Sequence, residues 1–224
     1  MRFRLTCEGE LKASQKDPLD MQVDKLAEHK QSLRKHFHLQ LKHLWETNWF
    51  LSTHKVFPAD YGASTHAARS LYARWAPKDD AMMPLVDAVA LNHQEHGYAF
   101  VPLVREDWRL LCSLDILFLR RDPPGSMVHA GDLDNRIKTL IDGLRKPNNA
   151  NELRGNEQLT TDETPFFCLV EDDKLVTGLR VESDTLLDPP GGASEHDRRQ
   201  VRLVITVDVR PYDATLFNLS FAGA

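Results

Sequence analysis

Residues 109–119 read RLLCSLDILFL. The apolar side chains at alternate positions of this segment are Leu110, Cys112, Leu114, Ile116 and Phe118. Because successive side chains of a β-strand point to opposite faces, this alternation predicts a strand with one face in the protein core. We expect residues 98–104 to form a second strand, paired with the first through a turn at residues 105–107.

Further strands and helices are predicted on both sides of this pair. Apolar runs, or alternation with a period of two, predict strands over residues 3–11, 166–170, 174–183 and 201–209. A helical apolar period or helix-end signals predict helices over residues 19–45, 63–75, 80–96 and 135–145, the third of them ending at Gly97. Residues 46–61 are expected to form a loop, and residues 147–164 a polar surface excursion. This order predicts an α+β fold in which helices pack on a mixed β-sheet.

Length and composition limit the class of protein. The chain has 224 residues, of which 42% are hydrophobic and 27% are charged, which is enough apolar content for one folded domain. No apolar run approaches the length of a membrane-spanning helix, and the first residues lack the apolar block of a secretory signal. The cysteines Cys7, Cys112 and Cys168 are widely spaced. We therefore expect a cytoplasmic protein with reduced thiols, without disulfides, a cysteine zinc site or a membrane partner.

Charge is distributed unevenly along the chain. The net charge of −5 at pH 7 argues against indiscriminate binding to nucleic acid. Residues 21–75, however, contain eight Lys or Arg against four Asp or Glu. A basic helix in this segment is predicted to contact DNA phosphates, and a solvated helix face is the alternative. The residues predicted to contact DNA are Arg34, Lys35 and Lys42 in this helix, and Arg120 and Arg121 at the mouth of the candidate site described next.

Residues 131–144 read GDLDNRIKTLIDGL and carry the first candidate site. In an extended backbone the side chains of Asp132 and Asp134 point to the same side, so both carboxylates could bind one cation. Carboxylate oxygens are the ligands that suit Mg²⁺ and Mn²⁺. Asp134, Lys138 and Asp142 follow one another at spacings of four, which places them on one face of a helix. There the Lys138 ammonium could stabilise charge on a phosphate or on a departing oxygen.

A second acidic group, residues 171–173 (EDD), directly follows the predicted strand over residues 166–170. Carboxylates at the end of a strand are held by a rigid element and can be aimed into a site. If this end meets the first motif, three or four carboxylates could gather around one or two metal ions, an arrangement that hydrolyses phosphodiesters. The alternative is structural: an ordinary acidic turn, a helix-capping Asp134 and a solvated Lys138.

The two motifs together resemble the signature of the RusA family, the Holliday junction resolvases of bacteria and their phages. The resemblance is carried by residues 132–135 (DLDN) with Lys138, Asp142 and Leu144, and by residues 170–176 (VEDDKLV). It covers residues 108–146 and 166–211. The resemblance implies a RusA-like α+β fold, a homodimer, and a Mg²⁺-dependent endonuclease that cuts branched DNA symmetrically. We expect Mn²⁺ to substitute for Mg²⁺.

The resemblance also implies roles for individual residues. Asp132, Asp134 and Asp173 correspond to the metal-binding catalytic aspartates, and Lys138 corresponds to the catalytic lysine. Asp172 matches a further acidic position and is expected to contribute to the metal site. Asp142 also matches a family position, where it could simply support the helix or the lysine.

The chain also departs from the family pattern. It is nearly twice as long as a compact resolvase, and the extra length lies in residues 20–96 and 147–164. We expect one RusA-like nuclease domain over residues 1–224, with an inserted helical region over residues 19–97. The family's Pro/Asn-rich loop after the first strand has no clear counterpart, which leaves the preferred branched substrate open. The alternatives are a catalytically silent DNA-binding protein of the same fold, and a nuclease acting on another nucleic acid in a phage-defence or mobile-element setting. A Ca²⁺-binding module is disfavoured, because the DxD triplet lacks the longer ligand run and glycine turn of such loops.

Overall fold

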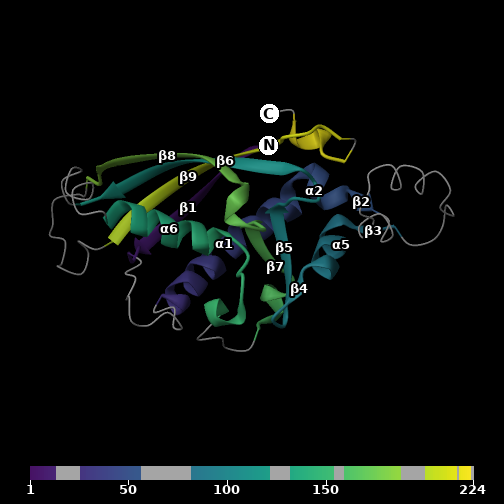
Figure 1. The fold of residues 1–224 in the computed structure, drawn as a ribbon, viewed down its shortest axis with the longest axis horizontal. Coiled ribbons are helices and arrows are strands. Elements are labelled where there is room, and N and C mark those ends of the chain that lie inside the picture. Colours follow the sequence, from purple (N-terminus) through teal and green to yellow (C-terminus); the bar gives the residue numbers. More distant parts are fainter. Residues whose placement is uncertain are drawn as a thin grey trace.

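The computed structural model describes residues 1–13, 26–56, 82–121, 132–153, 159–187, 200–215 and 217–222. Within these residues the chain has an α+β fold, in which four α-helices pack with mixed β-sheets (Figure 1). The predicted α+β class is therefore confirmed at this level. Among the helices that the structure describes, none combines the length and the apolar character needed to cross a membrane.

The larger sheet has the strand order β1-β9-β6-β8. Its strands are β1 (Arg2–Glu10), β9 (Gln200–Pro211), β6 (Leu110–Arg120) and β8 (Val176–Thr185). β9 pairs antiparallel with β1 and β6, whereas β8 runs parallel to β6. The strands predicted over residues 3–11, 109–119, 174–183 and 201–209 are thus confirmed, with small shifts at their ends.

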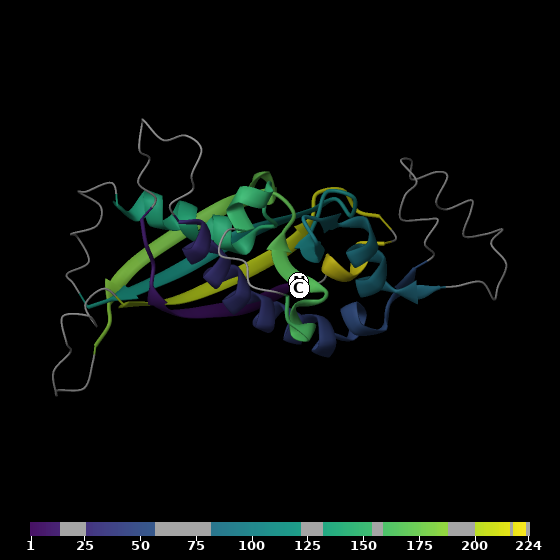
Figure 2. The ribbon, with the colours of Figure 1, turned by 90° about the horizontal axis from the view of Figure 1, so that it is seen from below.

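One face of this sheet forms the hydrophobic core. Ile116 of β6 lies opposite Ile205 of β9, and both side chains are fully buried. The helices α1 (Ala27–Thr47) and α6 (Asp132–Leu144) lie on this side of the sheet (Figures 1 and 2). α1 contributes Leu33, Phe37 and Leu41 at helical spacing to the same core. The helix α1 is therefore part of the core that holds α6 in place.

A second, three-stranded sheet corrects the predicted strand pairing. It consists of β4 (Gln94–Glu95), β5 (Tyr98–Val104) and β7 (Phe166–Val170), in the order β4-β5-β7. β5 pairs antiparallel with β4 and parallel with β7, so the expected pairing of residues 98–104 with β6 is wrong. The burial pattern of β5 explains the difference: it is buried along nearly its whole length, as parallel strands covered on both faces are. Arg109, with a φ of 52°, lies in the turn that leads into β6.

A small unit lies at one end of the molecule, on the right in Figure 1. It contains α2 (Trp49–Thr53), β2 (Lys55–Val56), β3 (Met83–Pro84) and α5 (Leu85–Asn92). The loop predicted over residues 46–61 is wrong for α2 and β2, because the Asn48 side chain accepts hydrogen bonds from the backbone N–H groups of Phe50 and Leu51 and so caps a helix.

The remaining predicted helices are found in part. The helix predicted over residues 19–45 corresponds to α1, and the helix predicted over residues 135–145 corresponds to α6. The helix predicted over residues 80–96 is shortened to α5, and Gly97, with a φ of 83°, lies in the turn between β4 and β5. The helix predicted over residues 63–75 lies outside the described residues.

The described part of the chain also contains short 3-10 helices. They are η3 (Ala150–Leu153), η4 (Thr161–Glu163), η5 (Asp173–Leu175) and η7 (Leu219–Phe221). The expectation that residues 147–164 form a surface excursion is wrong for η3 and η4, because Glu152, Leu153 and Glu163 are buried. Two of these buried groups are carboxylates that are paired with cations of α1. Residues 154–158 lie outside the described part.

Candidate active site

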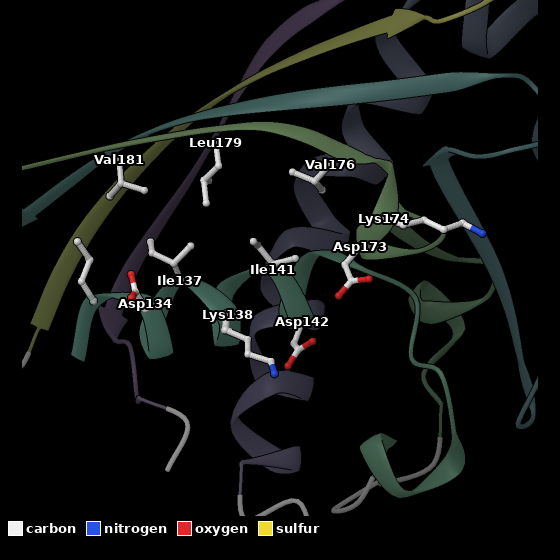
Figure 3. A pocket seen from close by; sticks show the side chains of 11 residues that line it. Asp134, Ile137, Lys138, Ile141, Asp142, Asp173, Lys174, Val176, Leu179 and Val181 are labelled. Atoms are coloured by element: carbon white, nitrogen blue, oxygen red, sulfur yellow. The ribbon is translucent and has the colours of Figure 1, made fainter. Parts of the chain in front are cut away.

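A pocket with a volume of about 610 Å³ lies between α6, β8 and η5 (Figure 3). Its apolar lining consists of Leu133, Ile137, Ile141, Val176, Leu179 and Val181. Its charged lining consists of Asp134, Lys138, Asp142, Asp173 and Lys174. The pocket therefore brings residues of the two acidic motifs, which are far apart in the sequence, into one hollow.

The geometry of α6 places three charged side chains on the pocket. Ile137 and Leu140 of α6 are buried in the core, which fixes the rotation of the helix. The prediction that Asp134, Lys138 and Asp142 share one helix face is confirmed, because all three line the pocket. Asp134 and Lys138 are exposed, whereas Asp142 is only 6% exposed.

The backbone at the start of α6 corrects the expectation that Asp132 and Asp134 lie in an extended segment. Asp132 and Asp134 both lie in the helix and not in an extended segment. Positions i and i+2 of a helix differ by about 200° around its axis, so the expected same-side geometry of an extended chain does not apply. Asp134 is also not the cap before a helix that starts at Asn135, since α6 begins at Asp132. A negative charge in the first turn of a helix is favourable because of the helix dipole. The side chain of Asp132 lies outside the described part of the structure.

The second acidic motif forms the turn between β7 and η5. The backbone N–H of Glu171 donates to the carbonyl of Val104 in β5. Asp172 is the N-cap of η5, where its carboxylate accepts a hydrogen bond from the backbone N–H of Lys174 at 3.0 Å. This hydrogen bond is the main reason that the pKa of the Asp172 carboxyl lies below its ordinary value. Asp173 follows in η5 and lines the pocket.

The neighbouring Lys174 is directed away from the pocket centre (Figure 3). Its Nζ lies 3.0 Å from Oε2 of Glu106, and this pairing raises the pKa of the lysine. Lys138, by contrast, makes no hydrogen bond or ion pair with any residue in the described part of the chain. Of the two lysines that line the described pocket, Lys138 is therefore the one without an acidic partner among the described residues.

The chemistry of the pocket carboxylates suits a hard divalent cation, because Asp134 and Asp173 present exposed oxygen ligands. Asp134 lies near the start of α6, whereas Asp173 lies beside Asp142, two turns further along (Figure 3). Two turns of α-helix span about 11 Å. In the described ranges no group of three His, Cys, Asp or Glu side chains is close enough to hold a metal ion. The gathering of Asp132, Asp134, Asp172 and Asp173 around a metal stays a prediction, since the Asp132 side chain is not described.

The structure places the residues that are predicted to bind DNA in different surroundings. Arg34 is only 2% exposed and its guanidinium lies 2.9 Å from the Glu152 carboxylate, so the prediction that it contacts DNA is wrong. Lys35 lies 2.9 Å from the carboxylate of Glu163, and Lys42 lies 3.3 Å from that of Asp162. Both lysines are half-buried and already partly neutralised.

Arg120 and Arg121 are also half-buried, at the end of β6. Both take part in interactions within the protein, and neither lines the pocket. Their predicted contact with DNA phosphates at the mouth of the site therefore stays a prediction.

Sequence reasoning missed the residues that surround Asp142. Its carboxylate lies 2.8 Å from the ammonium of Lys30 and 3.0 Å from the guanidinium of Arg145. The sequence signal was Lys30, which falls inside the apolar stripe of the helix predicted over residues 19–45. A charged side chain at such a position is buried with the stripe and therefore needs a partner of opposite charge.

Comparison of the chain with protein-family models, with curated proteins and with solved structures finds no match. The resemblance to the RusA family therefore stays an expectation from the sequence, carried by residues 132–144 and 170–176.

Proposed function

We propose that this protein is a Mg²⁺-dependent, structure-selective DNA endonuclease of the RusA type, with a RusA-like fold, that resolves Holliday junctions or related branched DNA. The observation that carries the proposal is the pocket lined by Asp134 and Lys138 of α6 and by Asp173 of η5. These are three of the residues that match the catalytic positions of the family, and Asp173 lies 35 positions after Lys138 in the chain.

The proposed chemistry follows from the residue types in the pocket. By the resemblance, Asp132 and Asp134 at the start of α6 and Asp173 in η5 would supply the carboxylates for one or two divalent cations, and Mn²⁺ should substitute for Mg²⁺. When bound, the metal ion supplies an activated water and neutralises charge on the scissile phosphate. Lys138 lies on the same helix face as Asp134, so its ammonium would bind a non-bridging phosphate oxygen and stabilise the charge that builds up during hydrolysis.

The proposal includes a homodimer, because symmetrical cleavage of a four-way junction requires two active sites. It also includes a dependence of DNA binding on the cation. Without a cation, the carboxylates of the pocket repel the phosphate backbone, so metal-free protein should bind DNA poorly.

The test is cleavage of a labelled four-way junction, a fork, a duplex and a single strand, in Mg²⁺ and in EDTA. The variants are Asp134→Asn, Asp173→Asn and Asp132→Asn, each of which removes one carboxylate charge with little change of shape. Asp87→Asn is the matched control, because Asp87 is exposed on α5 and lies outside the pocket lining. We expect the pocket variants to lose cleavage and to retain or improve DNA binding, and the control to cleave as the wild type does.

Each outcome has a definite meaning. Paired cuts in the junction alone, dependent on metal and lost in Asp173→Asn, would establish a resolvase. Metal-dependent cleavage of another substrate would support the proposed active site but assign it a different substrate class. Binding without cleavage of any substrate would indicate a catalytically silent protein, and retained cleavage in either Asp132→Asn or Asp173→Asn would refute the metal assignment.

A further inference from the structure

The strand β8 has an open outer edge. It is the last strand of the four-stranded sheet, and among the described strands it pairs only with β6 (Figure 2, from β8 in green to β1 in purple). Among the described residues, only those of β6 make hydrogen bonds to the backbone of residues 177–183. Just beyond β8, the Leu186 N–H donates to the Arg120 carbonyl of β6. Because backbone groups alternate in direction along a strand, those of Leu179 and Val181 point to the open edge.

The opposite edge of the same sheet is covered from within the chain. Gln40 of α1 donates its side-chain N–H to the Thr6 carbonyl of β1 at 2.7 Å, and its side-chain oxygen accepts the Thr6 N–H at 3.0 Å. His36 of the same helix lies 2.8 Å from the Thr6 carbonyl oxygen. An uncovered edge strand is a template for pairing with another chain, and lysine or proline at the edge commonly prevents this. β8 contains neither lysine nor proline. Its edge is therefore suited to pairing with a further strand.

The exposed charges of β8 are arranged symmetrically about Val181. Arg180 and Glu182 flank this residue, and their side chains are 70% and 60% exposed. Leu179 and Val181 line the pocket, so the alternation of the strand directs Arg180 and Glu182 to the opposite face of the sheet. Two antiparallel copies of β8 with Val181 at their centre would bring Arg180 of each copy opposite Glu182 of the other. In that arrangement the charges favour pairing of the edge.

Charge also selects this register over its neighbours. A pair of copies centred on Arg180 or on Glu182 would place like charges directly opposite each other, which is unfavourable. A pair shifted by two residues towards the end of β8 would oppose Glu182 to Asp184, and one shifted by two residues towards its start gains no ion pair. The register centred on Val181 gains two ion pairs. It also brings Leu179, which is 50% exposed, diagonally next to Val181 of the second copy.

We propose that β8 is the dimer interface of this protein and pairs antiparallel with β8 of a second copy around Val181, which joins two four-stranded sheets into one. This inference rests on the proposed function, which includes a homodimer but names no interface. The two-fold axis of such a pair is perpendicular to the sheet, so the same face of both sheets lies on the same side. The candidate active sites of the two copies therefore lie on one side of the joined sheet, as two cuts in one bound junction require.

The test is the oligomeric state of the protein without DNA, measured by sedimentation velocity. One pair of strands buries less area than the roughly 1,200 Å² of stable interfaces, so the protein concentration should range from about 1 to about 100 µM. Arg180→Glu places a glutamate opposite Glu182 of the second copy, and Glu182→Arg places two arginines opposite each other. Each variant should raise the Kd of the dimer by about tenfold or more.

Mixing the two variants is the decisive step. In a heterodimer of Arg180→Glu with Glu182→Arg, both cross-strand pairs again consist of opposite charges. An equimolar mixture should therefore form heterodimers with a Kd close to that of the wild type, and native mass spectrometry identifies them because the two variants differ in mass. A chain that carries both substitutions should likewise form dimers as the wild type does.

The matched control is Arg202→Glu. Arg202 lies on the same face of the sheet in β9, where it pairs with Glu8 of β1 away from the β8 edge, so its charge reversal should leave the dimer Kd unchanged. Arg180 pairs within its own chain only through exposed side chains, those of Asp115 and Glu182. Its substitution should therefore have little effect on stability, which urea unfolding of each variant checks.

The outcomes separate this inference from the nuclease proposal. A wild-type protein that stays monomeric at every concentration would overturn the interface and the homodimer, whereas the cleavage assay decides the nuclease chemistry independently. A wild-type dimer that both charge reversals leave unchanged, or two weakened variants whose mixture forms no heterodimer, would overturn only the β8 interface. A dimer that responds as expected but cleaves no DNA would refute the nuclease and leave the interface in place.

Discussion

Acidification should destabilise this protein, and His93 is the residue for which the effect can be worked out. His93 follows α5 and is buried. Burial, together with the positive charges of Lys146 and Arg105, lowers the pKa of its imidazole from 6.5 to about 4, against the opposing effect of Asp107 and Glu95. Because the folded pKa is the lower one, the unfolded chain takes up the proton first as the pH falls. Stability is therefore complete above pH 6.5 and is lost as the pH falls from 6.5 towards 4.

The size of this effect follows from the two pKa values. Between pH 7 and pH 5, His93 should lower the free energy of unfolding by about 2 kcal/mol, out of about 3 kcal/mol when the pH falls below both values. The assay is urea unfolding followed by tryptophan fluorescence at pH 7 and pH 5. Other histidines with lowered pKa values add to the wild-type loss, namely His29, His38 and His54. The difference between the wild type and His93→Phe isolates the contribution of this one residue.

The matched control is His43→Phe, since His43 is exposed on α1. We expect His93→Phe to lose about 2 kcal/mol less stability than the wild type between pH 7 and pH 5, and His43→Phe to lose as much as the wild type. Equal losses in the wild type and in His93→Phe would refute the reasoning, because the imidazole would then titrate alike in the folded and unfolded states.

Three further predictions concern the packing and the charges of α1. Arg34→Met should destabilise the fold by about 3 kcal/mol, because it leaves its buried carboxylate partner with one cation fewer, and urea unfolding measures this loss. Gly143→Ala should cost about 1–3 kcal/mol in the same assay, since an added Cβ would lie 2.8 Å from Cβ of Leu33, and an unchanged midpoint would contradict this contact. Lys35→Ala and Lys42→Ala should each change the slope of log affinity against log salt by less than one released counterion, as measured by DNA titration, because acidic partners already partly neutralise both lysines.

The features that could be predicted from the sequence are those that depend on local periodicity. The alternation of Leu114, Ile116 and Phe118 is sufficient to predict β6, because each side chain reports the face on which its own residue lies. The spacing of Asp134, Lys138 and Asp142 is likewise sufficient to predict their common helix face. Both patterns depend on geometry within one element, and both are confirmed.

The features that could not be predicted depend on partners far away in the chain. Residues 98–104 and 109–119 are neighbours in the sequence, and each is apolar enough to form a strand, but their periodicity carries no information on which strand lies beside them. The structure places them in different sheets, where β5 pairs with β7, more than sixty residues away. The backbone of residues 132–134 was assigned wrongly for a related reason, since a short acidic segment has no apolar period to distinguish a helix from an extended chain.

The basic segment of the chain shows how charge along a sequence can differ from charge in space. The excess of Lys and Arg in α1 predicts a positive surface only if these side chains face solvent. Instead, Lys30 lies against Asp142, Arg34 against Glu152 and Lys35 against Glu163, so the cations of one segment are compensated by acids that are more than a hundred residues away. Compensation of this kind makes Lys30 and Arg34 internal supports of the fold, while the predicted DNA contact of Lys35 and Lys42 stays a prediction. Among the described residues that line the pocket, a DNA backbone would meet Lys138 as the cation that has no acidic partner in that described part, and a bound metal ion would add further positive charge there.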